Sequence, residues 1–377
     1  MIKIGIECES IEGENRAWGL GKLIIKLLEE ISRRPKLGKD YKFVLYFKNS
    51  VPNFEFLKSP IFEKKIVPVP FFKGRLFPIY YLLLLPIRLW FERLDLMFWP
   101  AYMLPFGTFT KSIALMTEDV YYEAFYGKLP LKYRFFYAVF GTYSAKYSTK
   151  LMAISETSKK NIAQLYNIDL NRIFVNYLGI DIDPSSTKAS ESQQIKDDYI
   201  LFVGQAFPRR HLKETILAFE KILREFTDLK LIAIGPDKYE KPVIDSLIGQ
   251  VNKRSGREVV IHKDYVEDSK LAELYAGARA LVYVSDREAF GLPPMEALAF
   301  GVPPVIADNE LSHELFEDYA FFVKEPSPDK IAEGVRQALT ETDKIQKIKN
   351  SGPEFVKKYN WKSFADRFFD VIKKPTS

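Results

Sequence analysis

The sequence contains few residues that bind metals or form cross-links: one cysteine, Cys8, and three histidines in 377 residues. A single cysteine excludes an internal disulfide, and His211, His262 and His313 lack the spacing of a metal site. The N-terminus turns acidic at Glu7 before an apolar run of signal-peptide length can form. We therefore expect a cytoplasmic protein that holds no metal or other cofactor.

A continuous hydrophobic run of transmembrane length is also absent. The most apolar segment, residues 71–106, is interrupted by Pro78 and Pro86 and ends among charged side chains, whereas a spanning helix needs about 20 mostly apolar residues. Basic residues flank its central part, Ile79–Phe91. Two interpretations remain open for that part: an interfacial helix lying on a membrane, or a buried helix preceding the strand Leu96–Trp99.

The length and composition indicate two globular domains. The chain is too long for one ordinary core, and 47% hydrophobic with 28% charged residues is typical of a folded protein. Short apolar runs alternate with helical patterns in both halves, which favours parallel sheets covered by helices. The expected strands are Ile2–Ile6, Phe43–Phe47, Leu96–Trp99, Ser112–Met116, Lys150–Ile154, Tyr199–Val203, Leu229–Ile234, Val259–His262, Ala280–Val284, Pro304–Ala307 and Ala320–Val323.

A polar stretch, Asp183–Asp197, separates the two strand–helix blocks and has the composition of a linker. It predicts an α/β chain of two doubly wound domains, residues 1–185 and 186–355, that face a central cleft. Ligands of such sheets bind at the carboxyl ends of the strands.

Charge is unevenly distributed between the halves. Residues 1–185 carry 26 lysines and arginines against 18 acidic residues, and the remainder carries 29 against 31. The basic half is also rich in aromatic residues. An anionic membrane, an anionic substrate or nucleic acid would suit such a surface; alternatively, the aromatic residues are core and the basic ones are solvated.

The strongest chemical signal is the segment 285–301, which follows an expected strand and opens a helix. Gly291 allows close approach of the backbone to a ligand, and the following Pro293–Pro294 suits a first helical turn. The free N–H groups of that turn suit a diphosphate. Glu288 and Glu296 are placed to accept hydrogen bonds from sugar or ribose hydroxyls.

A second signal is basic. Arg209 and Arg210 follow the strand Tyr199–Val203 directly, at the carboxyl end of the sheet. Guanidinium groups match diphosphate oxygens in a bidentate manner and stabilise a leaving nucleotide as charge develops on it.

These two motifs resemble the signature of retaining glycosyltransferases with the GT-B fold, the group called family four or group 1. The resemblance covers most of the chain. Further matching segments are Met1–Ile6, Gly19-Leu20-Gly21, Ala153–Ser158, Leu178–Asp181, Leu201–Arg210, Tyr265–Val266 and Asn360–Trp361. The resemblance implies an acceptor-binding first domain, a donor-binding second domain, and a last helix, about 356–377, that packs back on the first.

The chain departs from the family pattern at three positions. Arg210 replaces the usual lysine, Gln205 stands where many members have arginine, and Glu118 replaces the histidine of a His-Asp pair whose aspartate, Asp119, is kept. A carboxylate at position 118 can still bind hydroxyls, but it would repel a nearby phosphate.

The resemblance implies transfer of a hexose from a nucleotide-sugar to a glycan or lipid-linked acceptor, with retention of configuration and without a metal. It implies the catalytic residues Glu288, Arg210, Asp119 and Glu118, and an acceptor-side loop of Gly19, Leu20 and Gly21. The implied donor-binding residues are Gly204, Gln205, Arg209, Arg210, Val266, Glu288, Ala289, Phe290, Gly291, Leu292 and Glu296. A sugar-nucleotide epimerase or a non-catalytic carbohydrate-binding relative is the alternative; nucleic acid is not an expected partner.

Overall fold

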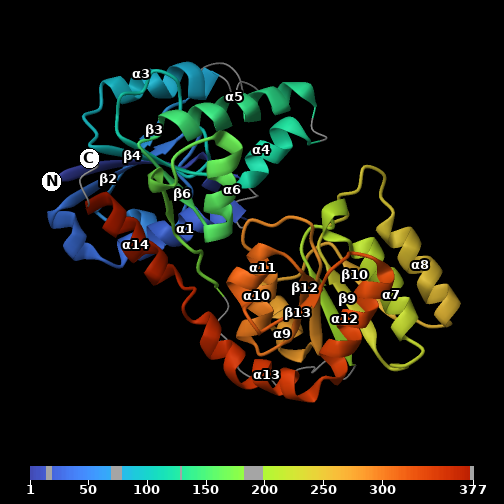
Figure 1. The fold of residues 1–377 in the computed structure, drawn as a ribbon. Helices are drawn as coiled ribbons and strands as arrows, with labels where there is room; N and C mark the ends of the chain where they lie inside the picture. Colours follow the sequence, from blue (N-terminus) through green and yellow to red (C-terminus); the bar gives the residue numbers. More distant parts are fainter. Residues whose placement is uncertain (14–18, 69–78, 128–129, 182–197, 374–377) are drawn as a thin grey trace. The chain divides into compact units, whose positions relative to one another are not determined.

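The computed structural model describes residues 1–13, 19–68, 79–127, 130–181 and 198–373 (Figure 1). The chain divides into two compact units: unit 1 comprises residues 1–179 and 360–377, and unit 2 comprises residues 180–359. The expected linker, Asp183–Asp197, lies outside the described residues.

In the described part of unit 1, seven parallel strands form one sheet in the order β3-β2-β1-β4-β5-β6-β7. Its strands are β1 (Ile2–Glu7), β2 (Tyr41–Phe47), β3 (Phe62–Ile66), β4 (Leu96–Trp99), β5 (Ser112–Leu115), β6 (Lys150–Ala153) and β7 (Ile173–Val175). The two edge strands, β3 and β7, were not among the expected strands. Charged residues interrupt the apolar pattern of β3 (Glu63, Lys64 and Lys65), and β7 is only three residues long.

The helices of unit 1 connect these strands. They are α1 (Gly19–Ser32), α3 (Leu85–Trp90), α4 (Glu118–Phe125), α5 (Leu131–Tyr147), α6 (Glu156–Tyr166) and α14 (Trp361–Lys373). Shorter turns are the 3-10 helices Glu9–Ile11, Pro35–Lys39, Glu55–Lys58 and Leu170–Arg172 and a π-helix, Tyr80–Leu84, that runs into α3.

The last helix, α14, belongs to unit 1 although more than 180 residues separate it from the rest (Figure 1). Phe368 packs against Phe98 with ring centroids 4.9 Å apart, and Phe369 packs against Phe43 at 6.1 Å. Each fully buried phenylalanine stabilises a fold by about 1.5–3 kcal/mol, so burial of these rings fixes the chain end on this unit.

In the described part of unit 2, six parallel strands follow the order β10-β9-β8-β11-β12-β13. They are β8 (Tyr199–Val203), β9 (Lys230–Ile234), β10 (Val260–Lys263), β11 (Ala280–Tyr283), β12 (Pro304–Ala307) and β13 (Phe321–Val323). Its helices are α7 (Leu212–Ile222), α8 (Ile244–Ser255), α9 (Asp268–Gly277), α10 (Leu292–Ala299), α11 (Glu310–Phe316), α12 (Pro328–Thr340), α13 (Thr342–Val356) and a 3-10 turn, Pro208–Arg210.

Both units are therefore Rossmann-like, with parallel strands joined through helices, as the alternation of apolar runs and helical patterns predicts. The central strands are buried on both faces, and all five residues of β8 are inaccessible to solvent. That explains why they appear in the sequence as continuous apolar runs.

The apolar segment before β4 is a helix with one buried side. Tyr81, Leu85 and Leu89 point into the core of unit 1. For this side of the helix, the structure agrees with the interpretation of the segment as a core helix. In the described ranges, no helix is both long and apolar enough to cross a bilayer.

Candidate donor-binding edge of unit 2

The site predicted from the sequence lies at the carboxyl edge of the unit 2 sheet. The strands β8 and β11 are neighbours at its centre, so the loops that follow them lie together. Gly204, which directly follows β8, has a φ of +134°, and a Cβ on Gly235 would lie 2.1 Å from the Gly204 carbonyl oxygen. Glycine at 235 is therefore required for the loops after β8 and β9 to approach this closely.

The structure brings Arg210 and Glu288 into direct contact. Arg210 Nε donates to Glu288 Oε1 at 2.7 Å, and Nη2 donates to Oε2 at 3.2 Å. Both side chains are about one-sixth exposed, so the pair is partly shielded from water. A bidentate guanidinium–carboxylate pair fixes both partners in position and orientation. The sequence predicted both residues for the site, but not that they would bind each other.

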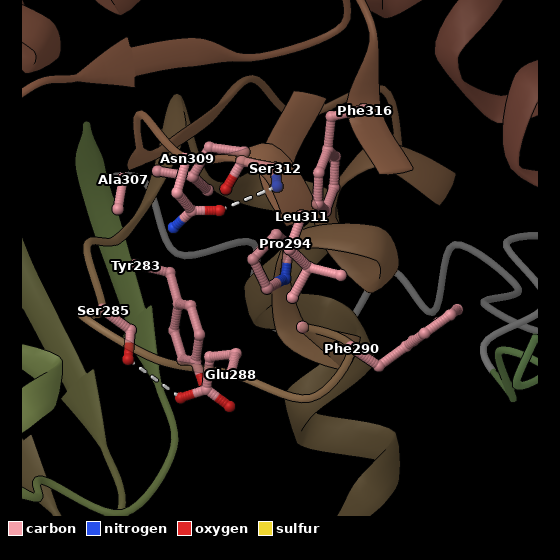
Figure 2. Close-up of a pocket in the computed structure, with 12 residues that line it drawn as sticks. Tyr283, Ser285, Glu288, Phe290, Pro294, Ala307, Asn309, Leu311, Ser312 and Phe316 are labelled. Atoms are coloured by element: carbon pink, nitrogen blue, oxygen red, sulfur yellow. Dashed lines mark hydrogen bonds between the residues drawn. The ribbon is translucent and has the colours of Figure 1, made fainter. Parts of the chain in front are cut away.

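Two further side chains hold the Glu288 carboxylate. Ser285 Oγ donates to Oε1 at 3.1 Å (Figure 2). The hydroxyl of the buried Tyr283 also faces this carboxylate as a hydrogen-bonding neighbour. The Tyr283 ring lies under the Arg210 guanidinium, 5.3 Å from its central carbon, a favourable cation–π geometry. Burial, and then the Glu288 charge, raise the pKa of Tyr283 well above its usual range. Tyr283 therefore contacts both members of the pair and was missed from the sequence, where it appears as part of an apolar strand.

The remaining basic residues of this loop lie beside the pair. Arg209 stacks on Phe207, 4.7 Å from the ring centroid, and donates through Nε to the Arg287 carbonyl at 3.4 Å. The next residue, His211, has a left-handed backbone with φ +49° and places Nε2 2.7 Å from Asp286. Burial lowers the pKa of His211, but hydrogen bonds to Glu214 and Asp286 outweigh that effect and raise it overall.

The helix α10 begins at this edge. Its N-cap, Gly291, has a φ of +88°, and a Cβ there would meet open space. Glycine is thus needed at 291 because other residues rarely adopt this backbone conformation, and not because a side chain would clash with a neighbour. Pro293 and Pro294 occupy the first turn, where a missing N–H breaks no helical bond. Ala289 and Phe290 lead into this turn from Glu288.

Glu296 differs from Glu288 although both belong to one motif. Its side chain is buried, and Oε2 accepts a hydrogen bond from the Tyr275 hydroxyl at 2.9 Å. The sequence predicted that Glu296 reaches ligand hydroxyls; the structure shows it bonded beneath the edge, to a tyrosine of α9. Helical spacing alone does not give the direction of a side chain relative to the core.

A pocket lies next to Glu288, between the loops after β11 and β12 (Figure 2). It is lined by Tyr283, Ser285, Glu288, Phe290, Gly291, Pro294, Ile306, Ala307, Asn309, Leu311, Ser312 and Phe316. Asn309 caps α11 by accepting from the Ser312 N–H at 2.9 Å. The residues after β12 were missed from the sequence, because a short polar turn between a strand and a helix carries no motif of its own.

Two other predicted donor-side residues also lie at this edge. The Gln205 carbonyl accepts from Arg210 Nη1 at 3.2 Å, so the backbone of Gln205 helps to orient the arginine. Val266 follows β10, the edge strand on the far side of β9. It is half-buried, and no contact with the Arg210–Glu288 pair is seen among the described residues.

The predicted acceptor-side residues lie in unit 1. Glu118 begins α4, is 5% exposed, and accepts from Ser158 Oγ and from Asn161 Nδ2, the latter at 3.4 Å. It therefore anchors α4 to α6, and its carboxylate is turned inward. Its neighbour Asp119 is half-buried in the same turn. The expected loop of Gly19, Leu20 and Gly21 is instead the first turn of α1.

The carboxyl edge of the unit 1 sheet holds acidic residues that were not predicted from the sequence to belong to a site. Glu7 ends β1 and is 2% exposed. Burial, and then the Glu9 carboxylate, raise the pKa of Glu7 from its usual 4.5 to about 8. Glu9 is itself bound by Lys48 Nζ at 2.6 Å and by the Tyr81 hydroxyl at 2.7 Å. The only signal in the sequence was the acidic pair directly after the first strand.

Comparison with known proteins agrees with the family resemblance that the motifs predict. Residues 185–355 match the family described as Glycosyl transferases group 1. The chain is 30% identical to the serotype-specific mannosyltransferase WbdA of Escherichia coli over 177 residues, which is 43% of this chain and 21% of WbdA. It is 27% identical to O-antigen chain mannosyltransferase B of Escherichia coli over 233 residues, 59% of this chain and 60% of that protein. The match therefore spans less than two thirds of each of these relatives.

Among solved structures, Anabaena HepE in complex with UDP and glucose is similar, with a TM-score of 0.74 and 14% identity over 99% of this chain and all of HepE. This likeness shows that the fold is of the GT-B kind. The resemblance to group 1 glycosyltransferases that the motifs predict is confirmed.

Proposed function

We propose that this chain, which resembles the group 1 glycosyltransferases in sequence and fold, transfers a hexose from a nucleotide-sugar donor to a glycan or lipid-linked acceptor. The observation that carries the proposal is the Arg210–Glu288 pair at the start of α10, on the carboxyl edge of a parallel sheet. An anion-binding guanidinium, a helix N-terminus and a hydroxyl-binding carboxylate are the groups that suit a sugar diphosphate.

Each group has a distinct task in this proposal. Arg209, Arg210 and the backbone N–H of Leu292, which precedes the two prolines at the start of α10, bind the diphosphate and stabilise it as it leaves. Glu288 accepts hydrogen bonds from the sugar hydroxyls, and Ser285 and Tyr283 keep its carboxylate in place. Through Nε, Nη1 and Nη2, Arg210 holds the Glu288 carboxylate and the Gln205 carbonyl, which keeps the guanidinium charge beside the place proposed for the diphosphate.

We propose that transfer retains the anomeric configuration and needs no metal. The bond between the anomeric carbon and the diphosphate oxygen breaks as the acceptor hydroxyl oxygen attacks the same face. The acceptor proton passes to the departing diphosphate, so no protein nucleophile is needed. The protein contributes positioning and electrostatic stabilisation. The two arginines support metal independence, because they place positive charge where the leaving group becomes more negative.

The acceptor is proposed to belong to cell-surface polysaccharide or glycolipid synthesis in the cytoplasm. The names of the relatives, a serotype-specific mannosyltransferase and an O-antigen chain mannosyltransferase, support the class of product. The UDP and glucose bound to HepE support a nucleoside diphosphate hexose as the class of donor. The single cysteine is consistent with a reducing compartment.

Product analysis tests this proposal. The purified chain is incubated with UDP- and GDP-hexoses and a panel of lipid-linked saccharides, with and without excess EDTA. We expect release of nucleoside diphosphate that depends on acceptor, an α-linked product from an α-linked donor by proton NMR, and equal rates in EDTA. A product of inverted configuration would contradict the retaining mechanism. Loss of activity in EDTA that magnesium or manganese restores would contradict metal independence.

A further inference from the structure

The helix α3 is apolar on both of its sides, together with the π-helical turn Tyr80–Leu84 that precedes it. One side, at Tyr81, Leu85 and Leu89, packs into the core of unit 1. The other side points to solvent at Leu83, Ile87, Trp90 and Phe91, with Trp90 58% and Phe91 83% exposed. Arg88 is the one charged residue of α3 and of the turn before it, and a helix this apolar normally has apolar surroundings on most of its sides.

A neighbouring loop extends this surface. Trp90 Nε1 donates to the Gly107 carbonyl at 2.8 Å, which places the loop around Gly107 beside the end of α3. Phe109, two residues further on, is 91% exposed. We call the outward side chains of this helix and loop the α3 face: Leu82, Leu83, Ile87, Trp90, Phe91 and Phe109. Several large apolar side chains gathered on one surface mark an interaction site.

Polar contacts hold the α3 face outward. Glu92, just after the helix, accepts from Lys3 Nζ at 3.2 Å, from Lys65 Nζ and from Arg88 Nε at 3.3 Å. At the other end, the Tyr81 hydroxyl bonds to Glu9 at 2.7 Å. The helix is thus pinned at both ends, and its outer side chains cannot turn inward without breaking these bonds.

The charges around the α3 face are positive. Arg93 and Lys111 are exposed, and Arg88 is half-exposed. The nearby acids are engaged: Glu92 is 8% exposed within its three ion pairs, and Asp95 accepts from the Lys3 backbone N–H at 2.7 Å. An apolar centre with a basic border is complementary to a bilayer with anionic headgroups.

We propose that the α3 face docks unit 1 on an anionic lipid surface, with Trp90, Phe91 and Phe109 at the level of the headgroups. The charge favours lipid over a second copy of this chain, because two copies facing each other would bring Arg88, Arg93 and Lys111 against themselves. The helix lies on the surface, since α3 and the turn before it are too short to span. Docking needs no donor or acceptor, so it is tested separately from glycosyl transfer.

The test is co-sedimentation of the whole chain with vesicles of phosphatidylglycerol and phosphatidylcholine, and with phosphatidylcholine alone, at low and high salt. We expect binding to the anionic vesicles that weakens with salt. The combined substitution Leu83→Ser, Ile87→Ser and Phe91→Ser should lower the partition coefficient at least about tenfold. Arg93→Ala with Lys111→Ala should lower it by about tenfold or more on anionic vesicles only. Leu170→Ser, at an exposed leucine elsewhere on unit 1, is the matched control and should bind as the unaltered chain does.

Tryptophan emission gives a second measurement that shows insertion directly. Anionic vesicles should shift the emission to shorter wavelength, brominated lipids should quench it, and Trp90→Phe should abolish both effects. The substituted side chains are exposed, so thermal melting should show folding unchanged. Equal vesicle binding by the triple variant, or binding by neither protein, would overturn the proposal. A dimer in gel filtration that the triple variant loses, without vesicle binding, would reassign the α3 face to self-association.

Discussion

The carboxyl edges of the two sheets use their glutamates in different ways. In unit 2, Glu288 remains partly exposed and is balanced by the guanidinium of Arg210. In unit 1, Glu7 is almost completely buried, and the ammonium group of Lys48 pairs with Glu9. Burial therefore raises the pKa of Glu7 to about 8. The same fold thus leaves one carboxylate partly exposed beside a guanidinium, and buries the other where its protonated form is favoured.

The comparison shows what decides the role of an acidic residue at the end of a strand. A paired carboxylate with some access to water keeps its charge and can exchange partners with a ligand. A buried one without a cation of its own is stable only when protonated, since an unpaired buried charge is strongly unfavourable. The following predictions test this distinction, from the largest expected effect to the smallest.

Removal of the unit 2 carboxylate should have the largest effect. Glu288→Ala is expected to lower kcat/KM about 10²–10³-fold with little loss of stability, because it removes the carboxylate that is proposed to contact the sugar. Glu296→Ala should also lose most activity, but through the fold: it leaves the buried Tyr275 hydroxyl unpaired and should therefore melt at a lower temperature. Steady-state kinetics and calorimetry measure both. Glu354→Ala, at an exposed glutamate of the same unit, is the control; full activity of Glu288→Ala would contradict the assignment.

The buried carboxylate of unit 1 should instead appear in the pH dependence of stability. The pKa of Glu7 is raised on folding, so its contribution is fully present below the usual value of 4.5 and is lost as pH rises towards about 8. The free energy of unfolding should fall by up to about 1.4 kcal/mol per pH unit in that window. Glu7→Gln should flatten the slope, and Glu55→Gln, at an exposed glutamate of the same unit, should not. Identical slopes for Glu7→Gln and the unaltered chain would mean that Glu7 is charged in the fold.

Removal of the guanidinium should weaken binding of nucleoside diphosphate. Arg210→Ala is expected to raise the dissociation constant about 10–100-fold, the range for a lost charge-assisted hydrogen bond. Arg210→Lys should be partly tolerated, since a point charge remains without the fork that holds Glu288. Isothermal calorimetry measures both. Arg336→Ala removes a similar bidentate pair, with Glu225 at 2.7 and 2.8 Å, away from the proposed site, and should leave affinity unchanged. An unaltered affinity in Arg210→Ala would rule out its proposed contact with the diphosphate.

The smallest effect is expected at Tyr283, which contacts both Arg210 and Glu288. Tyr283→Phe keeps the ring under Arg210 and removes only the hydroxyl that bonds to Glu288. We expect kcat/KM to fall by about fivefold to tenfold, the value of one hydrogen bond, with diphosphate affinity unchanged. Tyr319→Phe, in the turn between α11 and β13, serves as a control for the loss of a tyrosine hydroxyl. A fall in diphosphate affinity in Tyr283→Phe would show that the hydroxyl acts on Arg210 and not on Glu288.

Much of the fold could be predicted from the sequence, because buried parallel strands appear as apolar runs whatever lies around them. The edge strands β3 and β7 could not, since one is interrupted by charges and the other is very short. Glu288 and Arg210 were both predicted to be site residues, because their types suit the chemistry. Their mutual contact arises because β8 and β11 are neighbours in the sheet. The order of strands in a sheet cannot be predicted from their order along the chain.

The direction of a side chain was the other property that could not be predicted from the sequence. Glu118 and Glu296 occupy the expected places in the chain, yet both turn inward and bind hydroxyl groups of their own units. Motif spacing fixes where a residue stands on a helix, and packing around the helix decides which way the residue faces.

Hydrogen–deuterium exchange on addition of nucleoside diphosphate hexoses tests the central claim most directly. If unit 2 binds the donor at its carboxyl edge, amides of residues 204–211 and 288–295 should become protected, and those of residues 7–12, at the corresponding edge of unit 1, should stay unchanged. Arg210→Ala should reduce the protection at a fixed ligand concentration. Absence of protection in residues 204–211 and 288–295 with every donor tested, or protection confined to residues 7–12, would contradict the account.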